Sequence, residues 1–236
     1  MINSLHTAIR WKLIPSLLGL VLGVFMVAGA QASAKTTSGI EPDKLIGQLF
    51  DAMNDRLQAS RELVAADRSV LINIGEEVLG PYVSFDKMAK QILGKHWRKI
   101  TKDQQSRYTA AFKNRVSFAM ASQYDPEQEY SLDVKGAKFN RKKNKALVKS
   151  SVANESSGKK YLIDYKLYYN KKNDNWQVYD VIVEGVSMLQ SFKTASNEQM
   201  SRKGIEFLIA QLETETKEDE VKVKVQANAS DAVAAQ

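Results

Sequence analysis

One stretch decides the fold of this 236-residue chain, Trp176-Gln-Val-Tyr-Asp-Val-Ile-Val-Glu-Gly-Val-Ser-Met-Leu189. Its first half is rich in β-branched and aromatic residues, which suit a pleated and half-buried surface. Gly185 interrupts the pattern where a bulge or a sharp exit from a strand is expected. The stretch therefore predicts a strand that ends at Gly185 and leads into a C-terminal helix.

Upstream of this stretch, the chain shows the two-residue period of β-strands. Four strands are expected, at residues 130–139, 146–152, 159–169 and 175–184. The segments between them are rich in turn-forming residues, and short turns join neighbouring strands in opposite directions. The sequence thus predicts a four-stranded antiparallel meander with one apolar face and one largely solvent-exposed face.

The first half of the chain instead follows the period of amphipathic helices. Helices are expected at residues 41–65, from 67 to a stop at Gly80-Pro81, from a cap at Ser84 to Gly94, and from 101 to a break at 125–126. Thr101 and Gln104 have the spacing of a capping box. A last helix is expected around residues 205–212, and the predicted class is α+β, with a helix-rich N-terminal half packed on the sheet.

The N-terminus has the pattern of a secretory signal peptide. Arg10 and Lys12 precede an apolar run that ends in Ala32-Ser33-Ala34, and cleavage is expected near Ala34. The expected units are a signal peptide at 1–34, one domain at 35–214 and a flexible, charged and Ala-rich tail at 215–236. We expect a soluble periplasmic protein that relies on its core, since the chain has no cysteine.

Patterns for catalysis and metal binding are scarce. The chain lacks cysteine and keeps a single histidine, His96, after the predicted cleavage, which excludes histidine or thiolate zinc sites. Asp180 and Glu184 lie four residues apart, about 13 Å along a strand, which is too far for a pair of catalytic carboxylates. Asp180 is expected to hydrogen-bond at a sheet edge or to a neighbouring helix. No catalytic residue, metal ligand or cofactor is predicted.

Basic residues surround the first predicted hairpin turn, at Lys135, Lys138, Arg141, Lys142, Lys143, Lys145 and Lys149. A solvated turn explains such a run. The functional alternative is an electrostatic guide toward anionic membrane surfaces or acidic partner proteins. Nucleic acid is not an expected partner, because the signal peptide removes the protein from it.

Two stretches of the chain resemble a known family. One is Pro81-Tyr-Val-Ser-Phe-Asp-Lys-Met-Ala-Lys-Gln-Ile-Leu-Gly-Lys-His-Trp-Arg98 with residues 101–112, and the other is 176–188 with residues 203–212. The most specific part is Tyr179-Asp-Val-Ile-Val-Glu-Gly-Val-Ser187. They resemble the MlaC or toluene-tolerance family, the periplasmic phospholipid-binding component of the maintenance-of-lipid-asymmetry system. A departure is Ser191-Phe-Lys193, where many members have Asn-Tyr-Arg.

The resemblance implies an NTF2-like sheet and an interior that opens into an apolar pocket for phospholipid acyl chains. It implies a carrier without catalytic activity, which shuttles lipid between an outer-membrane Mla lipoprotein–porin complex and an inner-membrane ATP-driven Mla transporter complex. Phospholipid is then cargo rather than a cofactor. The chain is expected to act as a monomer.

Strand alternation and the resemblance together nominate the residues that line this pocket. They are Phe85, Met88, Phe112, Val116, Ile163, Tyr165, Leu167, Val178, Ile182, Val186, Met188 and Leu189. Each of these residues also fits an ordinary core position. A charged residue at Val186 is expected to abolish lipid retention if that position lies in the pocket.

Two other classes of function remain open from the sequence. An enzyme on the same fold could use Asp164 or Asp180 as a base, if that carboxylate is turned inward with a raised pKa. A periplasmic chaperone or adaptor would instead bind protein through an exposed apolar groove. The lining of the pocket separates the first alternative from a carrier, because an enzyme needs polar groups at the floor.

Overall fold

The computed structural model describes residues 39–125 and 128–234, and the expected signal peptide lies outside these residues. The helices are α2 (Pro42–Ala59), α3 (Arg61–Ala66), α4 (Val70–Leu79), α5 (Phe85–Leu93), α6 (Lys102–Ser122) and α7 (Met188–Ala234), with short 3-10 helices η2 (Gly80–Tyr82) and η3 (Gly94–Lys99). The strands are β1 (Tyr130–Phe139), β2 (Lys145–Asn154), β3 (Lys160–Asn170), β4 (Asn175–Val183) and β5 (Val186–Ser187). The predicted α+β class is confirmed.

The strands form one antiparallel sheet in the order β1-β2-β3-β4-β5, so the predicted meander is confirmed for the first four. The fifth strand corrects the prediction. Glu184 and Gly185 both adopt positive φ, 48° and 79°, and Val183 pairs with Val186 across them. Positive φ at both central positions is typical of the type I′ turn that closes two-residue hairpins. The chain therefore reverses into β5 before it starts α7.

A β-bulge in β4 exchanges the two faces of that strand. The register between β3 and β4 shifts at Tyr179, which is the extra residue. As a result Val178 shares a face with Val181, whereas Ile182 lies on the opposite face. Strict alternation would place Val178 and Ile182 on one face, so the sequence pattern could not show this exchange.

The helices of the first half follow the prediction with one break. Ser60, with φ −111° and ψ 14°, separates α2 from α3 where one helix is expected. The capping box is confirmed, since the Gln104 amide donates to the Thr101 hydroxyl at 3.1 Å and the Thr101 amide donates to the Gln104 side chain at 3.0 Å. Ser84 precedes α5 as predicted, but its hydroxyl bonds the Tyr168 hydroxyl at 2.9 Å instead of capping the helix.

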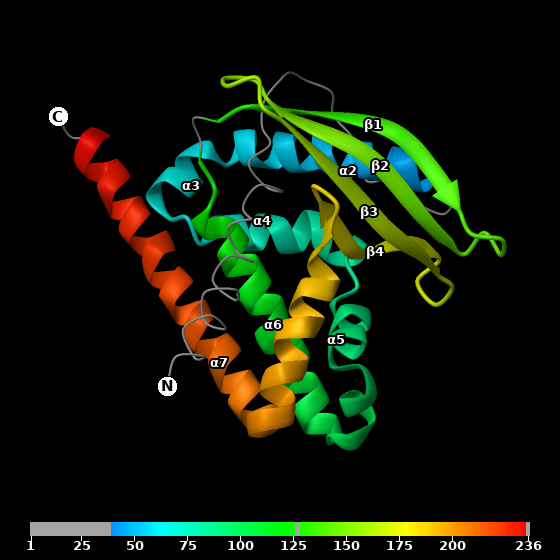
Figure 1. The fold of residues 1–236 in the computed structure, drawn as a ribbon. Coiled ribbons are helices and arrows are strands. Elements are labelled where there is room, and N and C mark those ends of the chain that lie inside the picture. The colour runs from blue at the N-terminus through cyan, green and yellow to red at the C-terminus, as the bar shows by residue number, and fades with distance from the viewer. Residues whose placement is uncertain (1–38, 126–127, 235–236) are drawn as a thin grey trace.

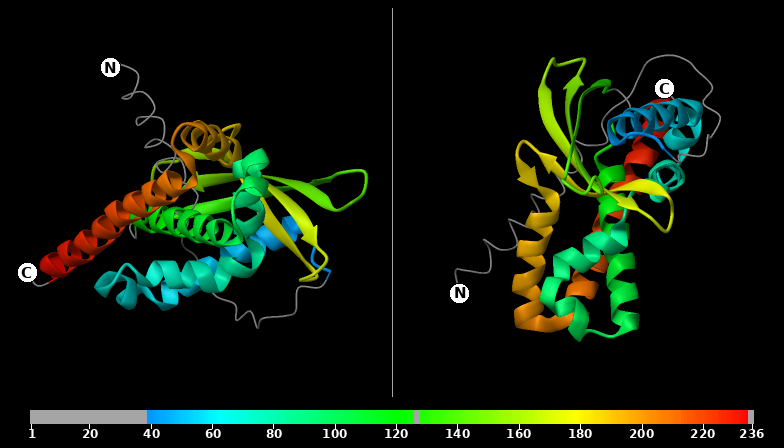
Figure 2. Two further views of the ribbon diagram at one scale, coloured as in Figure 1. Left: turned by 90° about the horizontal axis from the view of Figure 1, so that it is seen from below. Right: turned by 90° about the vertical axis from the view of Figure 1, so that its right-hand side faces the viewer.

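The helices form two groups on the sheet, one of α2 and α4 and the other of α5, α6 and α7. α2 packs on β1, β2 and α4, whereas α6 packs on α5, α7 and α4. Figure 2 shows α5, α6 and the first part of α7 extending away from the sheet. One core cluster lies between α5, α6, α7 and β4, and a second lies between α2 and the sheet. The space between the two groups is where a cavity forms.

The helix α7 turns sharply at Gly204, where φ is 79° and ψ is −177° (Figure 1). Only glycine adopts this conformation at little cost. The first part of α7 therefore runs away from the sheet, and the second part returns alongside α6.

The second part of α7 also corrects a prediction, because the flexible tail expected from residue 215 is helical. Arg115 of α6 donates from Nε to Glu215 at 3.0 Å and from Nη1 to Asp219, whose side chain is almost fully buried. Val223 is buried against residues of α2, α3 and α4. The tail prediction is therefore wrong as far as Val223. Charge pairing with Arg115 holds a segment whose own apolar content is low.

Candidate binding cavity

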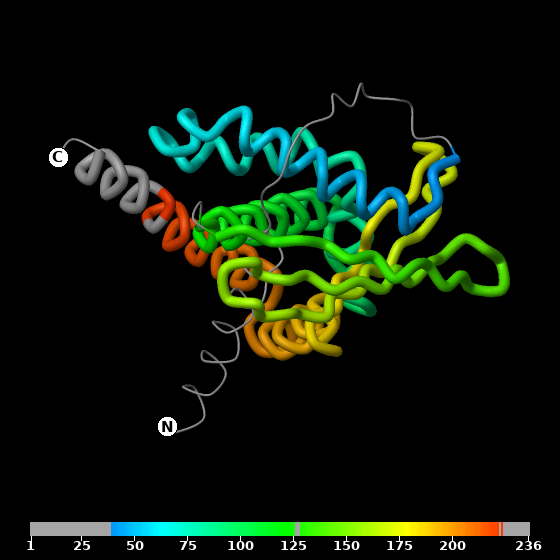
Figure 3. Tube along the Cα trace, turned by 90° about the horizontal axis from the view of Figure 1, so that it is seen from above, coloured from blue at the N-terminus to red at the C-terminus, as the bar shows by residue number. Residues whose placement is uncertain are grey.

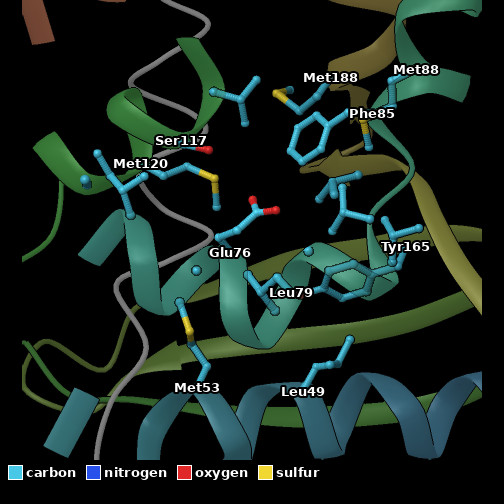
Figure 4. A pocket seen from close by; sticks show the side chains of 18 of the residues that line it. Leu49, Met53, Glu76, Leu79, Phe85, Met88, Ser117, Met120, Tyr165 and Met188 are labelled. Atoms are coloured by element: carbon cyan, nitrogen blue, oxygen red, sulfur yellow. The ribbon is translucent and has the colours of Figure 1, made fainter. Parts of the chain in front are cut away.

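A cavity of about 230 Å³ opens between the two groups of helices and the inner face of the sheet. Side chains from α2, α4, α5, α6, β3, β4 and the start of α7 line it, and most of them are apolar. Figure 4 shows Leu49 and Met53 of α2 on one side, with Phe85, Met88 and Met188 on the other. The cavity thus separates two apolar layers that would otherwise form one continuous core.

Eight of the twelve nominated residues line this cavity: Phe85, Met88, Phe112, Val116, Tyr165, Val178, Met188 and Leu189. They come from α5, α6, β3, β4 and α7, so the fold brings together positions that are far apart in the sequence. Burial raises the pKa of Tyr165 to about 12, so this phenol in the wall is neutral at neutral pH.

The other four nominated residues lie outside the cavity. Ile163 and Leu167 are fully buried, but they pack within the sheet core rather than along the cavity. Ile182 lies on the opposite face of the sheet because of the bulge in β4. Val186 is 45% exposed on β5, because the type I′ turn carries it past the end of the inner face.

The wall that α2 and α4 supply was not among the nominated positions. This wall contains Ile46, Leu49, Phe50, Met53 and Leu57 of α2, and Leu71, Ile72, Gly75, Glu76 and Leu79 of α4. An amphipathic pattern predicts that one face of a helix is buried. The pattern does not tell whether that face packs against other side chains or lines a cavity. Methionine was the available indication: four of the five after residue 34 (Met53, Met88, Met120 and Met188) line the cavity.

Phe112 lies at the centre of an aromatic cluster on the α6 side of the cavity. Its ring makes edge contacts with Phe85 at 6.1 Å and Phe192 at 5.1 Å, and it stacks on Tyr108 at 6.4 Å between ring centroids. Phe85, Phe112 and Phe192 all line the cavity. Interlocked rings of this kind form a rigid wall, in contrast to the adaptable methionines.

A polar pair marks one edge of the cavity. Lys113 of α6 lies 2.6 Å from Glu76 of α4, and both side chains are partly exposed. Figure 4 shows the Glu76 carboxylate pointing from α4 into the cavity. Because a surface ion pair contributes little to stability, this bridge between α4 and α6 can open at small cost.

The buried carboxylate of Asp180 lies beside the apolar wall, and both of its oxygens accept hydrogen bonds from other parts of the protein. One oxygen accepts hydrogen bonds from Lys166 Nζ at 2.9 Å and from the Ser187 hydroxyl at 2.7 Å. The other accepts from the Leu189 amide at 3.0 Å. The expectation that Asp180 bonds to a neighbouring helix is therefore confirmed, since Leu189 is in the first turn of α7. Asp164 pairs with Ile182 and lies on the face of the sheet opposite to Tyr165 and Val181.

Two kinds of feature are absent from residues 39–125 and 128–234. Within these ranges no helix is long and apolar enough to cross a membrane. Nor do the described residues include three or more His, Asp or Glu side chains grouped so that they could hold a metal ion.

Two comparisons with known sequences name one family, and one solved structure shares the fold. The family model described as "MlaC protein" matches residues 47–214. The intermembrane phospholipid transport system binding protein MlaC of Haemophilus influenzae is 22% identical over 198 residues, which cover 84% of this chain and 90% of that protein. A phospholipid-binding protein from Ralstonia solanacearum, solved in complex with a phospholipid, has the same fold with a TM-score of 0.67. It is 17% identical, and the match covers 77% of this chain and 99% of that one.

Proposed function

This chain belongs to the MlaC family, and from that premise we propose that it is a periplasmic carrier that shields phospholipid acyl chains in its cavity. The observation that carries the proposal is the apolar cavity between the α2–α4 wall and the α5–α7 wall. The names of its relatives in Haemophilus influenzae and Ralstonia solanacearum support phospholipid as the ligand. No catalytic step is part of this function.

Physical chemistry requires such a cavity for a soluble lipid carrier. Two acyl chains contain about 30 methylenes, and each costs about 0.8 kcal/mol when it is exposed to water. Free tails would thus cost on the order of 20 kcal/mol. Since protein cores are packed to near-crystal density, an ordinary core offers no space for them.

The size of the cavity bears on how the lipid is held. Its volume of about 230 Å³ exceeds the roughly 150 Å³ void that takes up one benzene, but is below the about 300–1,000 Å³ of typical ligand pockets. This space fits part of one acyl chain. We therefore propose that α4 and α6 separate when lipid binds, with the Glu76–Lys113 pair opening and the methionine side chains changing rotamer.

The proposed route runs between an outer-membrane Mla lipoprotein–porin complex and an inner-membrane ATP-driven Mla transporter complex. The name of the Haemophilus influenzae relative, an intermembrane transport system binding protein, supports this route. We propose that the carrier acts as a monomer, which leaves the partly exposed Glu76–Lys113 edge accessible to each complex.

The route can be tested by exchange of labelled lipid. Protein purified from cells grown with labelled phosphate is mixed with vesicles that contain the ATP-driven complex, and with vesicles that lack it. We expect label to move between protein and membrane only where the complex is present. Protein that carries no label, or label that moves equally with both vesicles, would contradict the proposed shuttle.

A further inference from the structure

Two turns project from the same end of the sheet (Figures 1 and 3). One joins β1 to β2 at residues 140–144, and the other joins β3 to β4 at residues 171–174. The turns are connected at their base, because the Tyr169 amide donates to the Asn144 carbonyl oxygen at 3.0 Å. Figure 3 shows the β1–β2 hairpin extending beyond the helices.

This end of the sheet, here named the basic tip, is densely positive. Its exposed cations are Lys138, Arg141, Lys142, Lys143, Lys145, Lys171 and Lys172. Asp174 is the acidic residue in the two turns. Among the described residues, none of these seven cations forms an ion pair.

The folding of the tip does not depend on these cations. Asn140 Oδ1 accepts hydrogen bonds from the amides of Asn144 and Lys145, both at 3.0 Å, and Asn170 Oδ1 accepts from the Lys172 amide at 3.0 Å. Asparagine side chains and backbone amides therefore shape both turns. A solvated turn needs polar residues of either charge, whereas seven unpaired charges of one sign repel one another and destabilise the fold.

Three aromatic rings lie at the base of the basic tip. Phe139 is 42% exposed and lies 5.9 Å from Trp176, which makes an edge contact with Tyr169 at 5.4 Å. Aromatic rings with an apolar body and a polar edge are typical of residues at the head-group level of a bilayer. An exposed phenylalanine beside lysines is the combination that interfacial membrane segments use.

We propose that the basic tip docks the protein on an anionic phospholipid bilayer, with the lysines at the phosphate level and Phe139 in the interface. Six of the seven cations are lysines, which act as flexible point charges. A surface that recognises the carboxylates of one acidic protein would gain more from the planar fork of arginine. Membrane docking does not require lipid in the cavity, so it is separate from the carrier function.

Co-sedimentation with vesicles tests the docking surface. The variant Arg141→Gln/Lys142→Gln/Lys143→Gln removes three exposed charges from the β1–β2 turn. The matched control Lys95→Gln/Lys99→Gln/Lys217→Gln removes three exposed lysines elsewhere. Each lysine near an anionic surface changes the partition constant about fivefold, so three change it on the order of 100-fold.

We expect wild type and control to bind vesicles that contain phosphatidylglycerol, and to bind pure phosphatidylcholine vesicles far more weakly. Binding should disappear in 1 M salt, where the Debye length is only about 3 Å. The partition constant of the tip variant should fall on the order of 100-fold. Phe139→Ser should lower the partition constant but not abolish binding, because all seven cations remain. Equal binding by tip variant and control would overturn the proposal.

Two further arms separate docking by the tip from membrane contact by the cavity and from binding to an acidic protein. A variant with a narrowed cavity, Met120→Trp, should bind phosphatidylglycerol vesicles as the wild type does. Loss of its vesicle binding would mean that the cavity, not the tip, contacts the membrane. Immobilised polyglutamate serves as a model of an acidic protein. If it retains the wild type but not the tip variant, and if the wild type binds phosphatidylglycerol and phosphatidylcholine vesicles equally, then the tip binds an acidic protein and membrane docking is wrong.

Discussion

At the scale of single residues, Asp180 joins the sheet to the wall of the cavity. Its buried carboxylate accepts hydrogen bonds from Lys166, Ser187 and Leu189, which lie on β3, β5 and α7. A buried carboxylate is stable only where such donors replace water. This side chain therefore fixes the start of α7 and places Met188 and Leu189 in the wall.

Replacing this carboxylate tests its structural role. We expect Asp180→Ala to lower the free energy of unfolding by about 2–4 kcal/mol, because three donors lose their acceptor and the Lys166 ammonium loses its counter-charge. Urea unfolding measures the change. The matched control is Asp164→Ala on the partly exposed face of the sheet, which should change stability by at most about 0.5 kcal/mol. Equal losses in the two variants would contradict this role.

Val186 provides a second test at this scale. The sequence pattern and the family resemblance nominate it for the pocket, but its side chain is 45% exposed and lies outside the cavity. We now expect Val186→Glu to keep both its stability, within about 0.5 kcal/mol, and its bound phospholipid. Phosphorus analysis of the purified protein measures the lipid. A folded Val186→Glu protein without lipid would show that β5 contributes to binding after all.

At the scale of elements, the contact between α6 and the second part of α7 depends on charge. Arg115 pairs with Glu215 and Asp219 in an interior position, whereas Arg107, on the same helix, pairs with Glu206 of α7 on the surface. The two arginines join the same two helices but differ in burial. They therefore form an internal comparison between buried and exposed ion pairs.

We expect Arg115→Met to lower the free energy of unfolding by about 3–5 kcal/mol, because it leaves the buried carboxylate of Asp219 without its guanidinium. Arg107→Met should cost at most about 1 kcal/mol. Hydrogen exchange should become faster over residues 215–223 only in the first variant. Similar behaviour of the two variants would mean that the interior pair does not anchor α7.

At the scale of the whole molecule, the cavity exists because its walls come from both helical groups. The sequence pattern predicts the helices, the first four strands and the capping box at Thr101 and Gln104, since these depend on local spacing. It also nominates eight lining residues, but all of them lie on α5, α6, α7 or the sheet. The α2–α4 wall is set by how the helices pack across the sheet, which no local pattern contains.

The nominated residues that lie outside the cavity do so for a common physical reason. Ile163, Tyr165 and Leu167 alternate identically in sequence, yet only Tyr165 reaches the cavity, because helix packing decides which part of the inner face stays uncovered. A one-residue bulge at Tyr179 places Ile182 on the face opposite to Val178, although both would share a face in a regular strand. The alternation of residue types in the sequence does not reveal such a bulge. In each case a long-range contact, not a local preference, determines the outcome.

The most direct test of the central claim is the amount of phospholipid in purified protein, measured by organic extraction and mass spectrometry. We expect about one molar equivalent in the wild type and in Met200→Trp, which enlarges a methionine outside the cavity. Met120→Trp narrows the cavity and should contain clearly less, while its circular dichroism spectrum stays that of the wild type. Equal phospholipid in Met120→Trp and Met200→Trp, or none in the folded wild type, would contradict the claim that this cavity holds the acyl chains.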